Sequence, residues 1–91
     1  MNTRERFEKF HRENPAVYEM FKRFTFEAIR AGKAHLSAAM IVERIRWETN
    51  VVTTGDQFKI NDQYTPHYSR LFMEDFPEHD GFFFTRRLRA A

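Results

Sequence analysis

The sequence predicts a mostly helical α+β domain with four helices, a short hairpin or loop, and a C-terminal strand. Three observations lead to this fold class. Apolar residues recur at helical spacing in four segments, and two of these segments begin at an Asn-Pro or Thr-Pro pair, which is a typical helix start. The stretch Phe82–Arg89 instead has a strand-like arrangement, although Arg86 interrupts its apolar side. One side carries Phe82, Phe84 and Leu88, and the other carries Phe83, Thr85, Arg87 and Arg89. Because the chain has only 91 residues, we expect a single domain over 1–91.

The first expected helix lies within residues 1–13. Phe7, Phe10 and His11 follow the i, i+3, i+4 spacing of a narrow apolar stripe, and most of the residues around them are charged. We therefore expect a short amphipathic helix that is appended to a core formed by residues 15–89. This stripe gives the helix one face with which to pack against that core.

Asn14 and Pro15 mark the start of the second expected helix. An asparagine side chain accepts hydrogen bonds from the first free amides, and proline at the first helical position lacks an amide that would go unpaired there. Gly32 closes the helix, because glycine adopts the left-handed conformation that ends many helices. The expected buried face comprises Val17, Phe21, Phe24 and Ala28.

The third expected helix follows a short extended bridge at 33–36. Ser37 is the expected N-cap, and the helix runs from Ala38 to about Glu48 with Ile41, Val42 and Ile45 on its inner side. The β-branched residues that follow disfavour helix, so we expect the helix to end there. A hairpin or ordered loop is predicted for 51–60.

The fourth expected helix begins at Thr65-Pro66 and ends near Phe76, since Pro77 cannot continue it. Its apolar face comprises Tyr68, Leu71 and Phe72. A turn at Gly81 then leads into the terminal strand, where we expect Phe82, Phe84 and Leu88 on the inner side.

This order of elements resembles the winged-helix family. The resemblance is carried by His35–Ser37 leading into the 38–47 helix, and by Thr65–Phe76 followed by Gly81–Arg89. It implies a DNA-binding protein in which the last helix enters a groove and the terminal strand forms a wing. About sixteen residues join the third and fourth helices, where the family usually has a tight turn. Three shorter phrases are similar to those of small uncharacterised bacterial and phage proteins: Arg44–Glu48, Lys59–Tyr64 and Tyr68–Leu71.

On this interpretation the chain is a small DNA-binding regulator without enzymatic activity. Arginine pairs with guanine edges, and serine and histidine reach phosphates or bases, so residues on the outer side of the last helix would read double-stranded DNA. Cations on the neighbouring segments would contact the backbone. We expect a homodimer, because one module of this size buries little DNA surface. The candidate nucleic-acid-binding residues are Lys59, Tyr64, His67, Ser69, Arg70, Arg86, Arg87 and Arg89.

The alternative is a protein-interaction module, for example a phage-derived adaptor or inhibitor. It would act through exposed aromatic residues, for which Phe26, Trp47 and Phe83 are the candidates, together with an acidic patch over residues 74–80. Large rings are usually mostly buried. We therefore expect the N-terminal helix to cover Phe26 and the segment 51–60 to cover Trp47, and exposure of these rings would favour a partner.

Composition excludes several classes of function. The chain has no cysteine, so disulfides, thiolate metal sites and cysteine nucleophiles are absent. Its four histidines lack the spacing of a helical metal site, and its three glycines are not clustered as in a phosphate-binding loop. We therefore expect no metal, no cofactor and no enzymatic activity. We also expect no membrane span, and the lack of cysteine fits the reducing cytoplasm.

Overall fold

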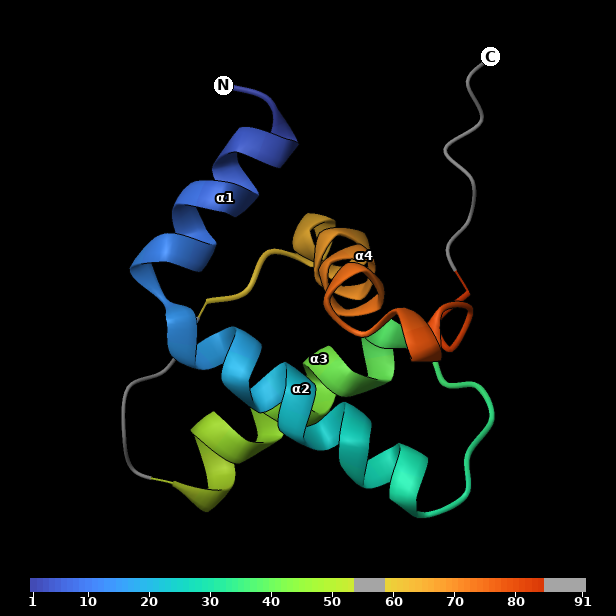
Figure 1. The fold of residues 1–91 in the computed structure, drawn as a ribbon. Coiled ribbons are helices and arrows are strands. Elements are labelled where there is room, and N and C mark those ends of the chain that lie inside the picture. The colour runs from blue at the N-terminus through green and yellow to red at the C-terminus, as the bar shows by residue number, and fades with distance from the viewer. Residues whose placement is uncertain (54–58, 85–91) are drawn as a thin grey trace.

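Four α-helices make up most of the part of the chain that the computed structural model describes, residues 1–53 and 59–84 (Figure 1). Helix α2 crosses α3, and α4 packs against both of them, while α1 precedes α2 and reaches the turn before α4. Short helical turns continue or flank these helices. The elements are α1 (Thr3–Glu13), α2 (Pro15–Arg30), α3 (Ala38–Trp47), the π-helical turn η1 (Glu48–Val52), the 3-10 turns η2 (Asp62–Tyr64) and η3 (Pro77–His79), and α4 (Thr65–Asp75).

The predicted α+β fold class is wrong, because the described part of the chain is helical and contains no β-strand. The expected bridge before α3 and the expected C-terminal strand meet at one isolated parallel pairing, between Leu36 and Phe83. Its hydrogen bond runs from the Leu36 N–H to the Phe82 carbonyl oxygen, at 3.3 Å. One pairing does not make a sheet, so among the described residues Phe82 and Phe83 are held by packing and not by a ladder of hydrogen bonds.

The alternation that predicted this strand does not describe how its phenylalanines pack. Phe82 and Phe83 are both buried, whereas Phe84, which was expected on the inner side, is 77% exposed. Gly81 adopts a φ of +87° and turns the chain directly after η3. The two consecutive rings therefore enter the core from a turn. The rest of the predicted strand, residues 85–89, lies outside the described residues.

The helix boundaries follow the sequence signals closely. Ser37 caps α3 as predicted, because its Oγ accepts a hydrogen bond from the amide two residues further on, at 3.2 Å. Pro15 is the first residue of α2, and Gly32 has a φ of +93° just beyond its end. Asn14 acts differently from the prediction: its side chain donates to the Phe10 carbonyl oxygen, so it closes α1 and does not cap α2.

Helix α3 ends at Trp47, close to the predicted end at about Glu48, but a π-helical turn continues through the β-branched residues in place of the predicted loop. The Thr49 Oγ1 donates to the Ile45 carbonyl oxygen at 3.0 Å, and the Asn50 side chain donates to the Arg46 carbonyl oxygen at 2.7 Å. These bonds satisfy carbonyl groups that a widened turn leaves available, and this outweighs the small propensity penalty of a β-branched residue. The chain therefore stays helical through Val52.

The predicted hairpin or loop at 51–60 is described only at its ends, because residues 54–58 lie outside the described part. The following segment is fixed to α3 by Arg46. Its guanidinium donates to the Ile60 carbonyl oxygen at 2.6 Å and pairs with the Asp62 carboxylate at 2.7 Å. This link positions η2, and therefore the start of α4, relative to α3.

Aromatic rings fill the centre of the bundle. The ring of Phe72, which is fully buried, lies 6.4 Å from that of Phe21, 5.3 Å from Phe26, 4.9 Å from Phe76 and 5.7 Å from Phe83, measured between centroids. Large rings bury much apolar area for each residue that is ordered. The chain has eleven phenylalanines, and this use of them explains how so short a domain forms a core without a disulfide or a metal.

Candidate functional site

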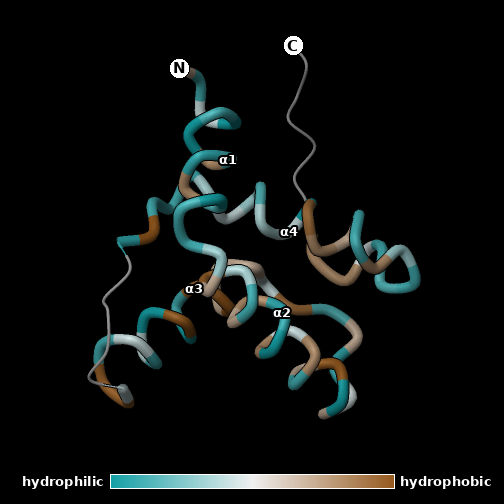
Figure 2. Tube along the Cα trace, turned by 60° about the vertical axis from the view of Figure 1, so that its left-hand side comes forward, coloured by the Kyte–Doolittle hydropathy of each residue, from teal (hydrophilic) through white to brown (hydrophobic). Residues whose placement is uncertain are grey.

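Large apolar side chains lie exposed along one side of α3 and η1. Met40 is 58% exposed, Trp47 59% and Val51 59%. Val52, beside Val51, is exposed to a similar extent. Met40 and Trp47, at i and i+7, lie on one line of α3 with Arg44 between them. Val51 follows Trp47 about one turn later in the π-helical η1. We call Met40, Arg44, Trp47 and Val51 the outer stripe of α3. Figure 2 shows the hydrophobic end of this helix lying away from the other helices.

Sequence reasoning identified Trp47 as a candidate but expected it to be covered, and it missed Met40 and Val51. The inner side of α3 already carries a complete buried stripe of Ile41, Val42 and Ile45. A second apolar line on the same helix was therefore detectable as a departure from simple amphipathicity. The expected helix end at residue 48 hid it, because Val51 was then assigned to a hairpin.

A groove of about 310 Å³ lies between the end of α2 and the start of α3. Its apolar lining includes Ala28 and Ala31 from α2 and Leu36, Met40 and Ile41 from α3 and the segment before it. Because Met40 belongs both to this groove and to the outer stripe of α3, the two surfaces are continuous. We call this hollow the α2–α3 groove.

The charged group at the junction of these surfaces is held in place. The Arg44 guanidinium pairs with the Glu48 carboxylate at 2.6 Å and lies over the Phe24 ring, 4.5 Å from its centroid. Both contacts fix a long side chain that would otherwise lose rotamer entropy on binding. Arg44 therefore forms a preorganised rim of the groove and leaves Trp47 uncovered.

The other two aromatic candidates do not form an exposed surface. Phe83 is buried, and Phe26 is half-buried beneath the end of α4 and η3. The ring nearest to it is Phe76, whose centroid lies 4.9 Å away, followed by Phe72 at 5.3 Å and His79 at 5.6 Å. The prediction that the N-terminal helix covers Phe26 is therefore wrong, although the prediction that it is covered is confirmed.

The candidate nucleic-acid-binding residues do not share one face. Ser69 is buried, and its hydroxyl donates to the Pro66 carbonyl oxygen at 2.9 Å. Tyr64 is half-buried against α1, where its ring lies 5.2 Å from that of Phe10. Lys59 is exposed, at the start of the segment before α4. Arg86, Arg87 and Arg89 lie outside the described residues.

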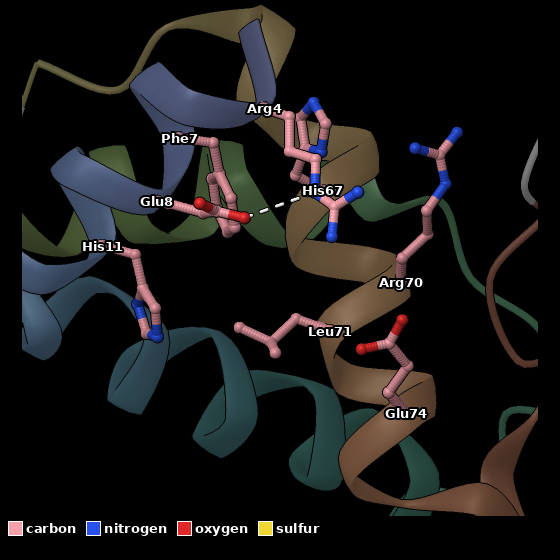
Figure 3. A pocket seen from close by; sticks show the side chains of 8 residues that line it. All are labelled: Arg4, Phe7, Glu8, His11, His67, Arg70, Leu71 and Glu74. Carbon is pink, nitrogen blue, oxygen red and sulfur yellow. Dashed lines mark hydrogen bonds and ion pairs between the residues drawn. The ribbon is translucent and has the colours of Figure 1, made fainter.

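His67 and Arg70 come together in a pocket of about 320 Å³ between α1 and α4 (Figure 3). The His67 ring stacks on Phe7, with 5.2 Å between centroids. The pocket, which we call the α1–α4 pocket, is lined from α1 by Arg4, Phe7, Glu8 and His11 and from α4 by His67, Arg70, Leu71 and Glu74. Each set has the spacing i, i+3, i+4, i+7 of one helix face, so two opposed helix faces form the walls.

The electrostatics of the α1–α4 pocket are set by its arginines. Burial, followed by the positive charges of Arg70 and Arg4, lowers the pKa of His67 below its usual value. Arg4 itself pairs with Glu8 at 3.2 Å. His67 is therefore neutral at pH 7. Two arginines and two glutamates, Glu8 and Glu74, line the pocket around it.

Two tyrosines beside this pocket provide a matched pair for a stability prediction. The Tyr18 hydroxyl donates to the Asp75 carboxylate at 2.6 Å, whereas the buried Tyr68 hydroxyl has no hydrogen-bond partner among the described residues. Tyr18→Phe is expected to lower the free energy of unfolding by about 1–2 kcal/mol, since it removes a bond to a charged acceptor. Tyr68→Phe is expected to leave it unchanged or to raise it by up to about 1 kcal/mol. Urea unfolding measures the free energy of unfolding of both variants. A larger decrease in Tyr68→Phe than in Tyr18→Phe would contradict the assignment of the hydrogen bond to the Tyr18 hydroxyl.

The described residues hold no group of three or more side chains suited to binding a metal ion. None of the helices in the described ranges combines the length and the apolar character that crossing a bilayer needs. Among the hollows and exposed faces of the described residues are the outer stripe of α3 with its groove and the α1–α4 pocket. Comparison of the chain with known protein families, with curated proteins and with solved structures gave no match.

Proposed function

We propose that this chain is a protein-interaction module that binds an amphipathic helix of another protein along the outer stripe of α3 and the α2–α3 groove. The observation that supports the proposal is the exposure of Met40, Trp47 and Val51 along one side of α3 and η1. Contiguous exposed apolar side chains mark interaction sites, and tryptophan is enriched among the residues that carry binding energy. A helix laid into an apolar groove is a recurring mode of recognition.

The dimensions and charge of the surface indicate the chemistry of the partner. Helix α3 has ten residues and η1 has five, so the stripe follows a helical segment of about 22 Å, which a partner helix of about four turns would match. Lys33, Arg44 and Glu27 are the charged residues that line the groove. Because Arg44 is paired with Glu48, Lys33 is the lining cation that forms no ion pair with another described residue. We therefore propose that the partner carries acidic residues beside its apolar stripe.

DNA binding by α4 is the competing proposal. Its support is the placement of Arg70, which is partly exposed on α4. The exposed part of the same helix also carries Glu74 and Asp75, and their negative charge opposes the approach of phosphates. The geometry of α3 therefore supports a protein partner better than the geometry of α4 supports DNA.

Trp47 supplies the readout for a direct test, because it is the only tryptophan and it is exposed. The probe is a fifteen-residue helical peptide with leucine at i, i+3, i+4 and i+7 and glutamate between them. Binding is expected to shift the Trp47 emission to shorter wavelength, with a Kd on the order of 10 μM. Val51→Ser and Met40→Ser are each expected to weaken binding by about tenfold without changing the far-UV circular dichroism spectrum.

Ala16→Ser is the control, because Ala16 is exposed in the first turn of α2, whereas the groove lies at the end of that helix, and we expect its Kd to equal that of the unmodified chain. Equal binding of a peptide with lysine in place of glutamate would contradict the proposed partner chemistry. An emission shift that depends on the concentration of the chain alone would assign the surface to a homodimer. A shift with duplex DNA that Arg70→Gln abolishes would support the DNA-binding alternative.

A further inference from the structure

The α1–α4 pocket lies on different helices from the proposed interaction surface and has the features of a small-ligand site. It has a volume of about 320 Å³, which is within the range of ligand pockets. An aromatic ring, Phe7, and an aliphatic side chain, Leu71, line it together with charged groups. Figure 3 shows these side chains on the two helices that face each other across the hollow. A pocket of this kind accepts a flat apolar body and orients it with a few polar groups.

The charges around the pocket select the sign and the size of a ligand charge. Arg4 is engaged by Glu8, so its charge is largely balanced within α1. Arg70 forms no ion pair with another described residue. One guanidinium group is therefore free to bind a ligand, and a planar carboxylate matches its geometry through two parallel hydrogen bonds.

A single negative charge fits this site better than a double one. Glu74 lies one helical turn beyond Arg70 and also lines the pocket, so a dianion such as phosphate would meet greater repulsion. Burial is the main cause of the lowered pKa of His67, and the positive charges of Arg70 and Arg4 add to it.

We propose that the α1–α4 pocket binds a small aromatic carboxylate, with its carboxylate on Arg70 beside His67 and its ring over Phe7 and Leu71. The ligand is a monoanion with a flat body, and Arg70 is the residue that selects its charge. This site is separate from α3, so it functions whether or not the outer stripe of α3 binds a partner.

Benzoate is the probe, titrated into the unmodified chain and followed by the NMR signals of the His67 ring. We expect saturable shifts with a Kd of about 1 mM, and at least tenfold weaker binding of benzamide, which has the same shape without the charge. Acetate, which lacks the ring, and phenyl phosphate, which is a dianion near neutral pH, are expected to bind at least fivefold more weakly than benzoate. Saturation with benzoate is also expected to raise the pKa of His67, because the bound anion favours the imidazolium form.

Substitutions separate charge selection from a general loss of structure. Arg70→Gln is expected to weaken benzoate binding at least tenfold and leave the amide spectrum of the other helices unchanged. Glu74→Gln is expected to strengthen binding, because it removes the opposing charge. Arg12→Gln, an exposed α1 position outside the pocket, is the control and should have no effect. Equal binding of benzoate and benzamide, unchanged binding in Arg70→Gln, or no saturation by benzoate would each overturn the proposal.

Discussion

Replacement of Phe72 with alanine is expected to lower the free energy of unfolding by about 4 kcal/mol, because it leaves a cavity in the centre of the core. Phe72 is fully buried, and its ring packs against rings from α2, from the end of α4 and from the segment after η3. The substitution therefore removes packing contacts with α2, with the end of α4 and with the segment after η3. Urea unfolding followed by far-UV circular dichroism measures the decrease in stability as a lower midpoint with an unchanged slope.

Phe84→Ala is the matched control for this prediction. Like Phe72, Phe84 is a phenylalanine that the sequence pattern placed on an inner face, but it is 77% exposed. Its replacement should therefore change the free energy of unfolding by no more than about 0.5 kcal/mol. A similar decrease in the free energy of unfolding in both variants would contradict the placement of Phe72 in the core and Phe84 on the surface.

Replacement of Phe7 with alanine is expected to lower the free energy of unfolding by about 3 kcal/mol and to release α1 from the bundle. Phe7 is the one fully buried residue of α1, and its ring lies 4.7 Å from that of Tyr68 and 5.2 Å from that of His67. The remainder of α1 is mostly charged and exposed. Short isolated helices are marginal in water, so α1 without this anchor should lose helical structure.

Amide hydrogen exchange tests this second prediction directly. We expect Phe7→Ala to increase the exchange rate of the α1 amides more than that of the α3 amides, each compared with the unmodified chain. Lys9→Ala is the control, because Lys9 is exposed on the same helix and makes only a surface ion pair with Glu13 at 3.9 Å. If α1 kept its protection in Phe7→Ala, some contact other than the Phe7 ring would hold it to the bundle.

Sequence reasoning located all four α-helices because each depends on local signals. Pro15 and Ser37 begin helices at the predicted positions, and Gly32 follows the end of α2 with the positive φ that glycine favours. The apolar spacing also identified the buried face of α2, including Phe21 and Phe24. These signals depend on residues within one or two turns of each other, so the folded environment does not change them.

The wrong predictions concern features that depend on contacts between residues far apart in the sequence. The alternation after Gly81 satisfied the pattern of a strand, but a strand needs a neighbour, and the available backbone provides one pairing at Leu36. The exposure of Trp47 depends on whether another segment covers it, and sequence patterns do not contain that information. The convergence of His67 with residues of α1 was equally hidden, since it depends on how α1 packs against α4.

The burial of Phe82 and Phe83 has a consequence for how the domain forms during synthesis. Helices α2, α3 and α4 all precede these two rings in the chain, yet both rings belong to the core that the helices share. A growing chain therefore presents apolar helix faces that cannot be fully covered until residue 83 has left the ribosome. Partly synthesised chains of this kind are prone to aggregate and are suited to chaperones that shield apolar segments. The order of residues along the chain thus makes the burial of Phe82 and Phe83 a late step in folding.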